Sequence, residues 1–249
     1  MAFGAIIIGD EILSGRRTDK HLPKLIALLS ARGLKLAWAR YVGDDRGRLA
    51  ETIRQSVATG DIVFSFGGIG ATPDDHTRQA AAAALGVELA LHPDAETALR
   101  ARFGDQINDH RLQMGVFPAG SEIVPNPYNQ VPGFSIRNHF FVPGFPVMAW
   151  PMVEWVLDTR FRHLHHAEDY VERAITVWDA YEGKLVDLME LVTAEFQGAT
   201  LFCLPAFAEA GRQHSIELGM KGPAAEVAAA MERIKAEVGA RGYAWQDKV

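Results

Sequence analysis

The residues that say most about the fold are DIVFSFGGIGATPDDHTRQAAAAALG, positions 61–86. It begins with an apolar run, passes through three glycines, and continues into an alanine-rich segment with the composition of a helix. A buried strand that leads through glycine into a helix is typical of α/β proteins, because glycine lets the backbone turn sharply and lets a ligand approach it. Asp74 and Asp75 lie where the helix is about to begin, so they serve either the helix or a ligand.

The segments before this stretch repeat the same strand–helix order. FGAIIIG at 3–9 predicts a strand buried on both faces, and residues 18–33 space their leucines at helical intervals. A second strand is predicted over 34–43 and a second helix over 46–60. This alternation predicts a three-layer α/β fold, a parallel-rich sheet with helices on both faces. We expect the apolar run at 87–92 to continue it as a further strand.

Beyond residue 94 the pattern loosens. Residues 111–134 are punctuated by prolines and are expected to wrap the sheet, while two short strands are expected around the turn residues Arg137 and Asn138. His139 is also expected to be a turn residue. A helix is predicted over residues 147–160. We therefore expect the three-layer domain to occupy residues 1–164.

A histidine-rich joint then leads into a second domain. Residues 168–249 follow the order strand, helix, strand, strand, helix, which is sufficient for a small α+β (βαββα) domain.

Composition restricts the class of protein. The chain has 249 residues, of which 48% are hydrophobic and 22% charged, and no apolar run approaches the length of a membrane span. Its start lacks a basic leader, and Cys203 is its single cysteine. The formal net charge of −6 and a pI near 5.8 argue against nucleic acid as a partner. We expect a cytoplasmic protein with no membrane or nucleic-acid partner.

The glycine loop has the composition of an anion site. In an open parallel sheet, ligands bind beyond the carboxyl ends of the strands, where Gly67, Gly68 and Gly70 let backbone amides approach a phosphate.

A purely structural interpretation of the following residues stays open. Thr72 could be the N-cap of the helix, with Pro73 in its first position and Asp74 and Asp75 complementing the helix dipole. That interpretation does not explain three glycines before the cap.

Three acids follow predicted parallel strands. Asp10, Asp44 and Asp75 all lie at the carboxyl ends of such strands, where a hard cation such as Mg²⁺ could join them to phosphate oxygens. For Asp44 or its neighbour Asp45, the alternative is a helix N-cap.

The motifs GDEILSG, YVGDD and GGIGATPDDHTRQAAAAALG, in this order and spacing, resemble the molybdopterin-binding (MoaB/Mog-like) domain family. The most similar form is the N-terminal part of competence/damage-inducible protein A (CinA) proteins. LQMGVFPAGSEIVPNP and FVPGFP extend the likeness to roughly residues 3–160. Residues 168–249 more faintly resemble the small middle domain of that family.

The resemblance implies a site made of the glycine loop and the strand-end acids. The implied catalytic residues are Asp75, Asp10 and Asp44, and the implied metal ligands are Asp10 and Asp75. The implied ligand-binding residues are Gly67, Gly68, Gly70, Thr72, Asp74, Thr77, Glu11, Ser14 and Gly15.

The resemblance also implies a ligand: a phosphorylated pterin such as molybdopterin, or an adenine nucleotide, bound with a divalent metal such as Mg²⁺. The reaction would cleave an ADP-ribose-type pyrophosphate or transfer an adenylyl group to molybdopterin. The chain ends without the amidohydrolase domain of full-length CinA proteins, so we expect no nicotinamide-mononucleotide deamidation. Single domains of this family form symmetric oligomers, which implies a homo-oligomer.

The sequence departs from the CinA pattern at two places, and the second, a missing acid, favours a non-catalytic binding or scaffold protein as the alternative. Ala71 replaces a proline of the CinA pattern, and Val147-Met148 stands where that pattern has Glu-Met.

Overall fold

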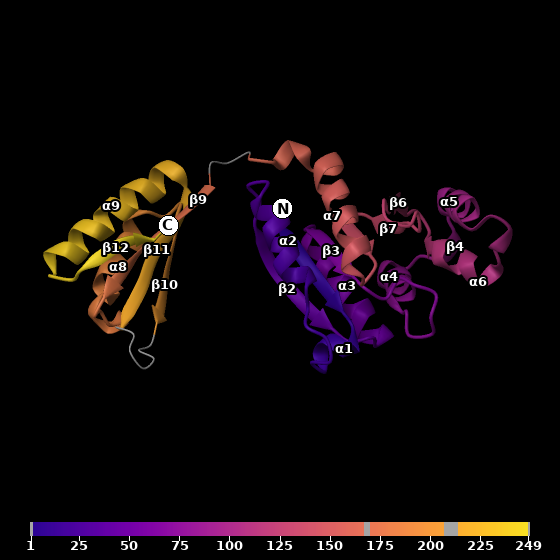
Figure 1. Ribbon diagram of the computed structural model, residues 1–249, viewed down its shortest axis with the longest axis horizontal. Coiled ribbons are helices and arrows are strands. Elements are labelled where there is room, and N and C mark those ends of the chain that lie inside the picture. The colour runs from indigo at the N-terminus through magenta and orange to yellow at the C-terminus, as the bar shows by residue number, and fades with distance from the viewer. Residues whose placement is uncertain (1, 167–169, 207–213, 249) are drawn as a thin grey trace. The chain divides into compact units, whose positions relative to one another are not determined.

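The protein is described by a computed structural model that covers residues 2–166, 170–206 and 214–248. Its contacts divide the chain into two units, Met1–His165 and His166–Val249 (Figure 1). Over the described residues, no helix combines the length and the apolar character needed to cross a membrane.

The N-terminal unit is built on a six-stranded sheet with the order β2-β1-β3-β8-β7-β6. Neighbours among the first four strands of this order run parallel, β7 is antiparallel to β8, and β6 is antiparallel to β7. The predicted parallel-rich sheet is therefore confirmed. The strands are β1 (Phe3–Ile8), β2 (Leu36–Val42), β3 (Ile62–Phe66), β6 (Glu122–Val124), β7 (Gly133–Ile136) and β8 (His139–Val142).

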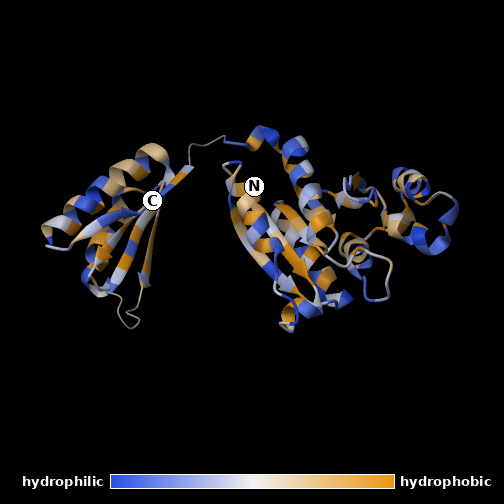
Figure 2. Cartoon of the chain, in the orientation of Figure 1, coloured by the Kyte–Doolittle hydropathy of each residue, from blue (hydrophilic) through white to orange (hydrophobic). Residues whose placement is uncertain are grey.

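Helices cover both faces of this sheet, as the sequence predicts. Alternation along β1 sends Phe3, Ala5 and Ile7 into one core and Ile6 and Ile8 into another. Figure 2 shows the resulting concentration of hydrophobic residues on the central strands. One core is closed by α2 (His21–Ser30) and α7 (Pro146–Arg160), and the other by α3 (Arg46–Thr59) and α4 (Thr77–Leu85).

Residues 87–124 differ from the predicted pattern. The expected fourth strand is β4 (Leu89–Leu91), which pairs with β5 (Val116–Pro118) in a separate antiparallel ribbon rather than joining the main sheet. Between them lie α5 (Pro93–Phe103) and α6 (Asp109–Leu112). The proline-rich stretch does not simply wrap the sheet, because β6 within it forms the sheet's edge.

The prediction that His139 is a turn residue is wrong. It is the first residue of β8 and 1% exposed, and its Nε2 lies 2.7 Å from Oγ of Ser56. Arg137, at φ 53°, and Asn138 make the turn before it. Burial, and secondarily the charge of Arg137, lowers the pKa of His139 to about 4.

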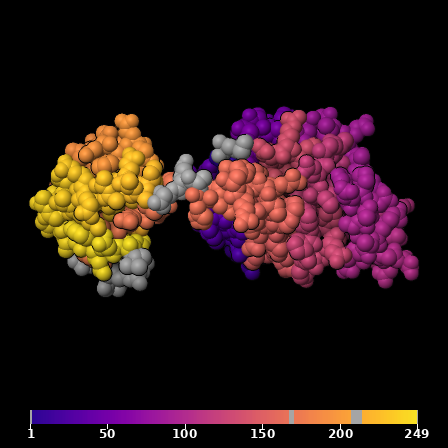
Figure 3. All heavy atoms as spheres, turned by 90° about the horizontal axis from the view of Figure 1, so that it is seen from above, coloured from indigo at the N-terminus to yellow at the C-terminus, as the bar shows by residue number. Residues whose placement is uncertain are grey.

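The C-terminal unit is an antiparallel sheet with the order β10-β11-β9-β12. The predicted strand–helix–strand–strand–helix order is present, and the short strand β12 follows it. Both helices contribute to one hydrophobic core with β9 and β11. In Figure 3 the yellow atoms of α9 and the residues after it form much of this unit's visible face. The elements are β9 (Tyr170–Trp178), α8 (Val186–Glu195), β10 (Thr200–Ala206), β11 (Ser215–Pro223), α9 (Ala224–Ala240) and β12 (Trp245–Lys248).

Candidate functional site

The ends of β1 and β2 bring two acids together. β1 leads through Gly9 into the single-turn helix α1 (Asp10–Leu13). The N–H of Asp10 donates to Oδ2 of Asp44 at 2.9 Å, and the N–H of Asp44 donates to Oδ1 of Asp10 at 3.3 Å. The helix N-cap is Asp45, whose carboxylate accepts from the N–H of Arg48 at 2.7 Å. Asp44 is therefore not the cap of α3 and lies at the strand end instead.

The first residues of α4 hold the carbonyls of the glycine loop. The hydroxyl of Thr77 donates to the carbonyl of Gly67 at 3.0 Å, and its N–H donates to that of Gly68 at 3.0 Å. The guanidinium of Arg78 donates to the carbonyl of Gly70 at 2.6 Å. Thr77 is fully buried, so it lies behind the loop rather than in the lining of the cavity described below.

This arrangement leaves the amides of the loop free. In a trans peptide the C=O and N–H point in opposite directions, so a carbonyl held against α4 directs the next residue's N–H away from α4. Within the described parts of the chain, no acceptor is bonded to the amides of Gly68, Ile69, Gly70 or Ala71. Four consecutive amides without an acceptor form the kind of concavity that binds anions.

Close packing accounts for the glycines. Gly67 has φ 106°, and a Cβ there would lie 2.7 Å from the carbonyl oxygen of Ile8. Gly68 has φ 66°, and a Cβ there would lie 2.3 Å from Oγ1 of Thr77. At Gly70 a Cβ would lie 2.5 Å from the carboxylate of Asp75. Each glycine therefore lets the loop lie against a different neighbour.

The interpretation of Thr72 as a helix N-cap is wrong. α4 begins at Thr77, and residues 72–75 form a turn in which the N–H of Asp75 donates to the carbonyl of Thr72 at 3.0 Å. Oδ2 of Asp75 accepts from the N–H and the hydroxyl of Thr72 at 2.8 and 2.5 Å. One oxygen of Asp75 thus closes the turn.

The glycine loop, Asp44 and Asp75 line a cavity of ≈ 440 Å³. Of the residues predicted for the site, Asp10, Ser14, Gly15 and Thr77 lie outside this lining. Among the described residues that line the cavity, Arg17 is the only basic one. The rest of the lining from residue 114 onward is largely apolar and includes two asparagines. The predicted residues in the lining are Glu11, Asp44, Gly67, Gly68, Gly70, Thr72, Asp74 and Asp75, and the later part of the chain contributes Met114, Asn126, Asn129, Val131, Pro132, Pro143, Phe145 and Met148.

Negative charge gathers around Asp44. Burial, followed by the charges of Asp10, Glu11 and Asp74, raises the pKa of its carboxyl group, against the lowering effect of the hydrogen bond from Asp10. In the described ranges, no three His, Cys, Asp or Glu side chains are arranged to hold a metal ion. A cation held here would have to take part of its coordination from a ligand or from water.

Two buried side chains at the site were missed by sequence reasoning. Arg78 is 4% exposed behind the glycine loop. His21 stacks on Phe66 with ring centroids 4.6 Å apart, and its Nε2 donates to the carbonyl of Gly144 at 3.0 Å. Burial lowers the pKa of His21. His21 and Arg78 lie in the first turns of α2 and α4, where a polar or charged residue is normally exposed to solvent. The local sequence pattern therefore did not indicate that either side chain is buried.

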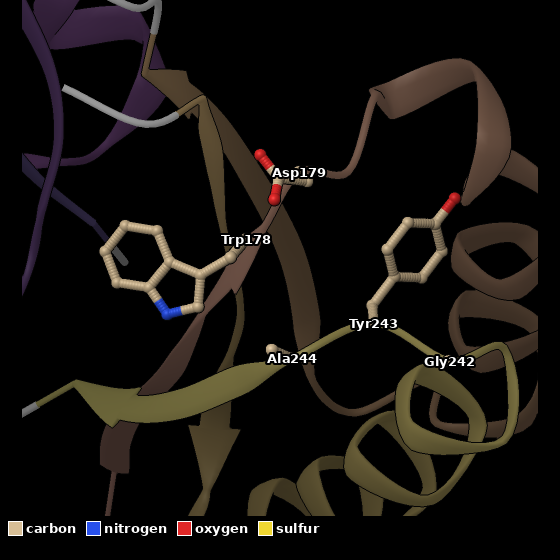
Figure 4. Close-up of a pocket in the computed structure, with 5 residues that line it drawn as sticks. All are labelled: Trp178, Asp179, Gly242, Tyr243 and Ala244. Atoms are coloured by element: carbon tan, nitrogen blue, oxygen red, sulfur yellow. The ribbon is translucent and has the colours of Figure 1, made fainter. Parts of the chain in front are cut away.

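The C-terminal unit has a smaller cavity of ≈ 310 Å³. Its lining consists of Trp178, Asp179, Gly242, Tyr243 and Ala244 (Figure 4). In Figure 4 the ring of Trp178 lies to the left and the ring of Tyr243 to the right, with Ala244 and Asp179 between them.

A parallel-rich sheet whose strand ends carry a glycine loop and a group of acids around a cavity defines an α/β small-ligand-binding domain. The chain belongs to the family described as "Probable molybdopterin binding domain", whose model matches residues 4–163. This finding confirms the resemblance seen in the sequence motifs.

Relatives and a solved structure agree with this assignment. The chain is 36% identical over 157 residues to a CinA-like protein of Anaeromyxobacter sp. (strain K), covering 60% of this chain and 38% of the relative. It is 32% identical over 203 residues to a CinA-like protein of Desulforapulum autotrophicum, covering 76% of this chain and 48% of the relative. These matches span less than half of each relative's length. The crystal structure of the protein CinA from Thermoplasma acidophilum, described as of unknown function, is similar with a TM-score of 0.58 and 25% identity, covering 64% of this chain and 98% of that one.

Proposed function

We propose that the N-terminal unit binds a small phosphorylated ligand, with a phosphate on the amides of Gly68, Ile69, Gly70 and Ala71. The observation that carries this proposal is that these four consecutive amides have no acceptor among the described residues and belong to a loop that lines the cavity. The apolar part of the lining, with Asn126 and Asn129 beside it, suits a flat heteroaromatic ring with a polar edge. A phosphorylated pterin or an adenine nucleotide has both parts.

The charge of the cavity supports a divalent cation in the bound complex. Four lining carboxylates against one arginine would repel a phosphate unless a cation lay between them. Asp10 and Asp75 are our proposed metal ligands, because Oδ2 of Asp10 and Oδ1 of Asp75 accept no hydrogen bond from a described residue. Mg²⁺ commonly takes one or two carboxylates, with phosphate oxygens and water completing its shell. When bound, it would neutralise phosphate charge and polarise a P–O bond.

The reaction that suits these parts is cleavage or formation of a phosphoanhydride, with an ADP-ribose-type pyrophosphate or molybdopterin and an adenine nucleotide as substrates. Such chemistry depends on positioned phosphates more than on a covalent residue. In this proposal the loop amides hold the phosphate, and Asp44 completes the acidic side of the site. Non-catalytic binding in the same cavity is the second candidate, favoured because the described residues include no group of three metal-ligating side chains.

Calorimetric titration of the full chain with ADP-ribose and with pyrophosphate tests the proposal, each with Mg²⁺ and with EDTA. We expect binding that requires Mg²⁺ and is weakened by Asp75→Ala. Asp105→Ala, at an exposed acid outside the cavity lining, is the matched control and should bind as the wild type does. Chromatography of the ADP-ribose sample after incubation separates turnover from binding alone. Absence of binding by both ligands under both conditions would refute the phosphate site.

A further inference from the structure

Arg78 is a buried cation without a carboxylate bonded to it. It is 4% exposed, and its guanidinium donates to three backbone carbonyls, those of Gly70 at 2.6 Å, Val116 at 3.2 Å, and Gln113. Its Nε has no partner in the described structure. Burial lowers the pKa of Arg78, and the charge of Asp75 opposes that effect. Desolvation of a cation is costly, so a site that retains one without a direct ion pair calls for an explanation beyond packing.

The bonded carbonyl of Gly70 belongs to the same peptide group as the N–H of Ala71. That N–H is one of the four loop amides without an acceptor. Fixing the C=O of a planar trans peptide also fixes the direction of its N–H. A charged donor on the oxygen further polarises the peptide and strengthens its N–H as a donor.

We propose that Arg78 is a positioning residue of the phosphate site, which orients and polarises the Gly70–Ala71 peptide so that the N–H of Ala71 binds a phosphate oxygen. The inference rests on the proposed function. Arg78 acts on the ligand only through the peptide. Thr77 orients the Gly67–Gly68 and Gly68–Ile69 peptides in the same way, but its hydroxyl and its N–H are neutral donors. Among these peptides, polarisation by a charged donor is therefore specific to the one that carries the N–H of Ala71.

The loop is also joined by Arg78 to a distant segment. Gln113 and Val116 lie 35 and 38 residues after Arg78. The guanidinium that bonds their carbonyls also bonds the carbonyl of Gly70. A lysine would keep the charge but lose the planar fork that serves several acceptors at once. The position therefore requires arginine, and lysine should replace it incompletely.

The first test uses the unaltered full chain. In an amide ¹H–¹⁵N titration with pyrophosphate and Mg²⁺, we expect the resonance of Ala71 to shift together with those of Gly68 and Ile69. A shift of Gly68 and Ile69 with Ala71 unmoved would overturn the role of Arg78 and leave the proposed function standing. If no loop amide moved and calorimetry detected no binding, the proposed function itself would fail.

The second test uses Arg78→Ala, Arg78→Lys and the control Arg32→Ala. Arg32 also donates to a backbone carbonyl, that of Leu28 at 2.9 Å, and lies outside the cavity lining. Loss of a charged donor is expected to weaken pyrophosphate binding at least about tenfold in Arg78→Ala and less in Arg78→Lys. Millimolar guanidinium should restore binding to Arg78→Ala and leave Arg32→Ala unaffected, and melting temperatures measured without the ligand separate this effect from a general loss of stability. Wild-type affinity in either folded Arg78 variant would overturn the proposal.

Discussion

Asp10 and Asp44 exchange hydrogen bonds, each accepting on its carboxylate the backbone N–H of the other, at 3.3 and 2.9 Å. The two residues are 34 positions apart and lie at the ends of adjacent parallel strands. The exchange holds two like charges side by side, an arrangement that is unfavourable without a cation.

The first prediction concerns Asp44→Asn. Because the pKa of Asp44 is raised, the folded protein holds its proton more tightly than the unfolded chain does, so the ionised carboxylate lowers stability at neutral pH. The amide oxygen can still accept from Asp10, and the repulsion is removed. We expect an unchanged or slightly higher melting temperature and weaker Mg²⁺-dependent pyrophosphate binding. A clear fall in melting temperature would mean that the charge of Asp44 has a structural role.

The second prediction concerns Thr77→Val, which removes the hydroxyl bonded to the carbonyl of Gly67. A buried carbonyl left without its donor should lower the free energy of unfolding by about 1–2 kcal/mol. Phosphate-ligand binding should also weaken, since the loop loses one of its fixed peptides. Thr97→Val is the control, because the hydroxyl of Thr97 donates to a helix carbonyl at 3.0 Å on an exposed surface. Chemical denaturation that showed equal losses for both variants would contradict the role of Thr77.

The third prediction concerns Gly68→Ala. The new methyl group would meet Oγ1 of Thr77 in a left-handed backbone conformation, at φ 66°. We expect destabilisation above about 2 kcal/mol, together with loss of phosphate-ligand binding. Gly120→Ala separates the two causes, because Gly120 has φ 86° and open space around it. That variant should lose only about 1 kcal/mol and keep its binding.

The fourth prediction is a pH dependence of stability from His139. The pKa of this residue falls from 6.5 to about 4 on folding, so the unfolded chain takes up the proton first as the pH is lowered. Its contribution is complete above pH 6.5 and is lost as the pH falls towards 4, by about 3 kcal/mol at most. Urea denaturation across this range should show a weaker pH dependence in His139→Gln than in the wild type. Equal slopes for the two proteins would show that His139 does not titrate as its burial requires.

The fifth prediction concerns a shortened chain ending at His165. The two cores that enclose the six-stranded sheet draw only on residues 3–164, and the third core draws only on residues 171–243. The shortened chain should therefore fold and bind pyrophosphate with the affinity of the full chain. If it were folded by circular dichroism and bound nothing that the full chain binds, the ligand site would require the C-terminal unit.

Local pattern was sufficient to predict the layers of the fold. Apolar runs such as residues 3–8 and 62–66 are typical of strands buried on both faces. Helical spacing of apolar residues is typical of a helix buried on one face, so the strand–helix alternation could be predicted without knowledge of any tertiary contact. The neighbouring positions of Asp10 and Asp44 followed from the same reasoning, because parallel strands end at one edge of a sheet. The pairing of β4 with β5 could not be predicted, because the residue pattern of a three-residue strand is too short to identify its partner.

Consecutive residues were enough to identify the α/β alternation, the glycine loop and the family. The packing of distant segments was needed to show that Asp75 closes a turn before the helix, that His139 is buried against Ser56, and that Arg78 bonds the carbonyl of Gly70 from behind the loop. The bond between Ser56 and His139 joins residues 83 positions apart, and Arg78 reaches carbonyls 35 and 38 positions away. A side chain's burial and partners depend on which distant segments pack around it, and the composition of its own segment does not contain that information.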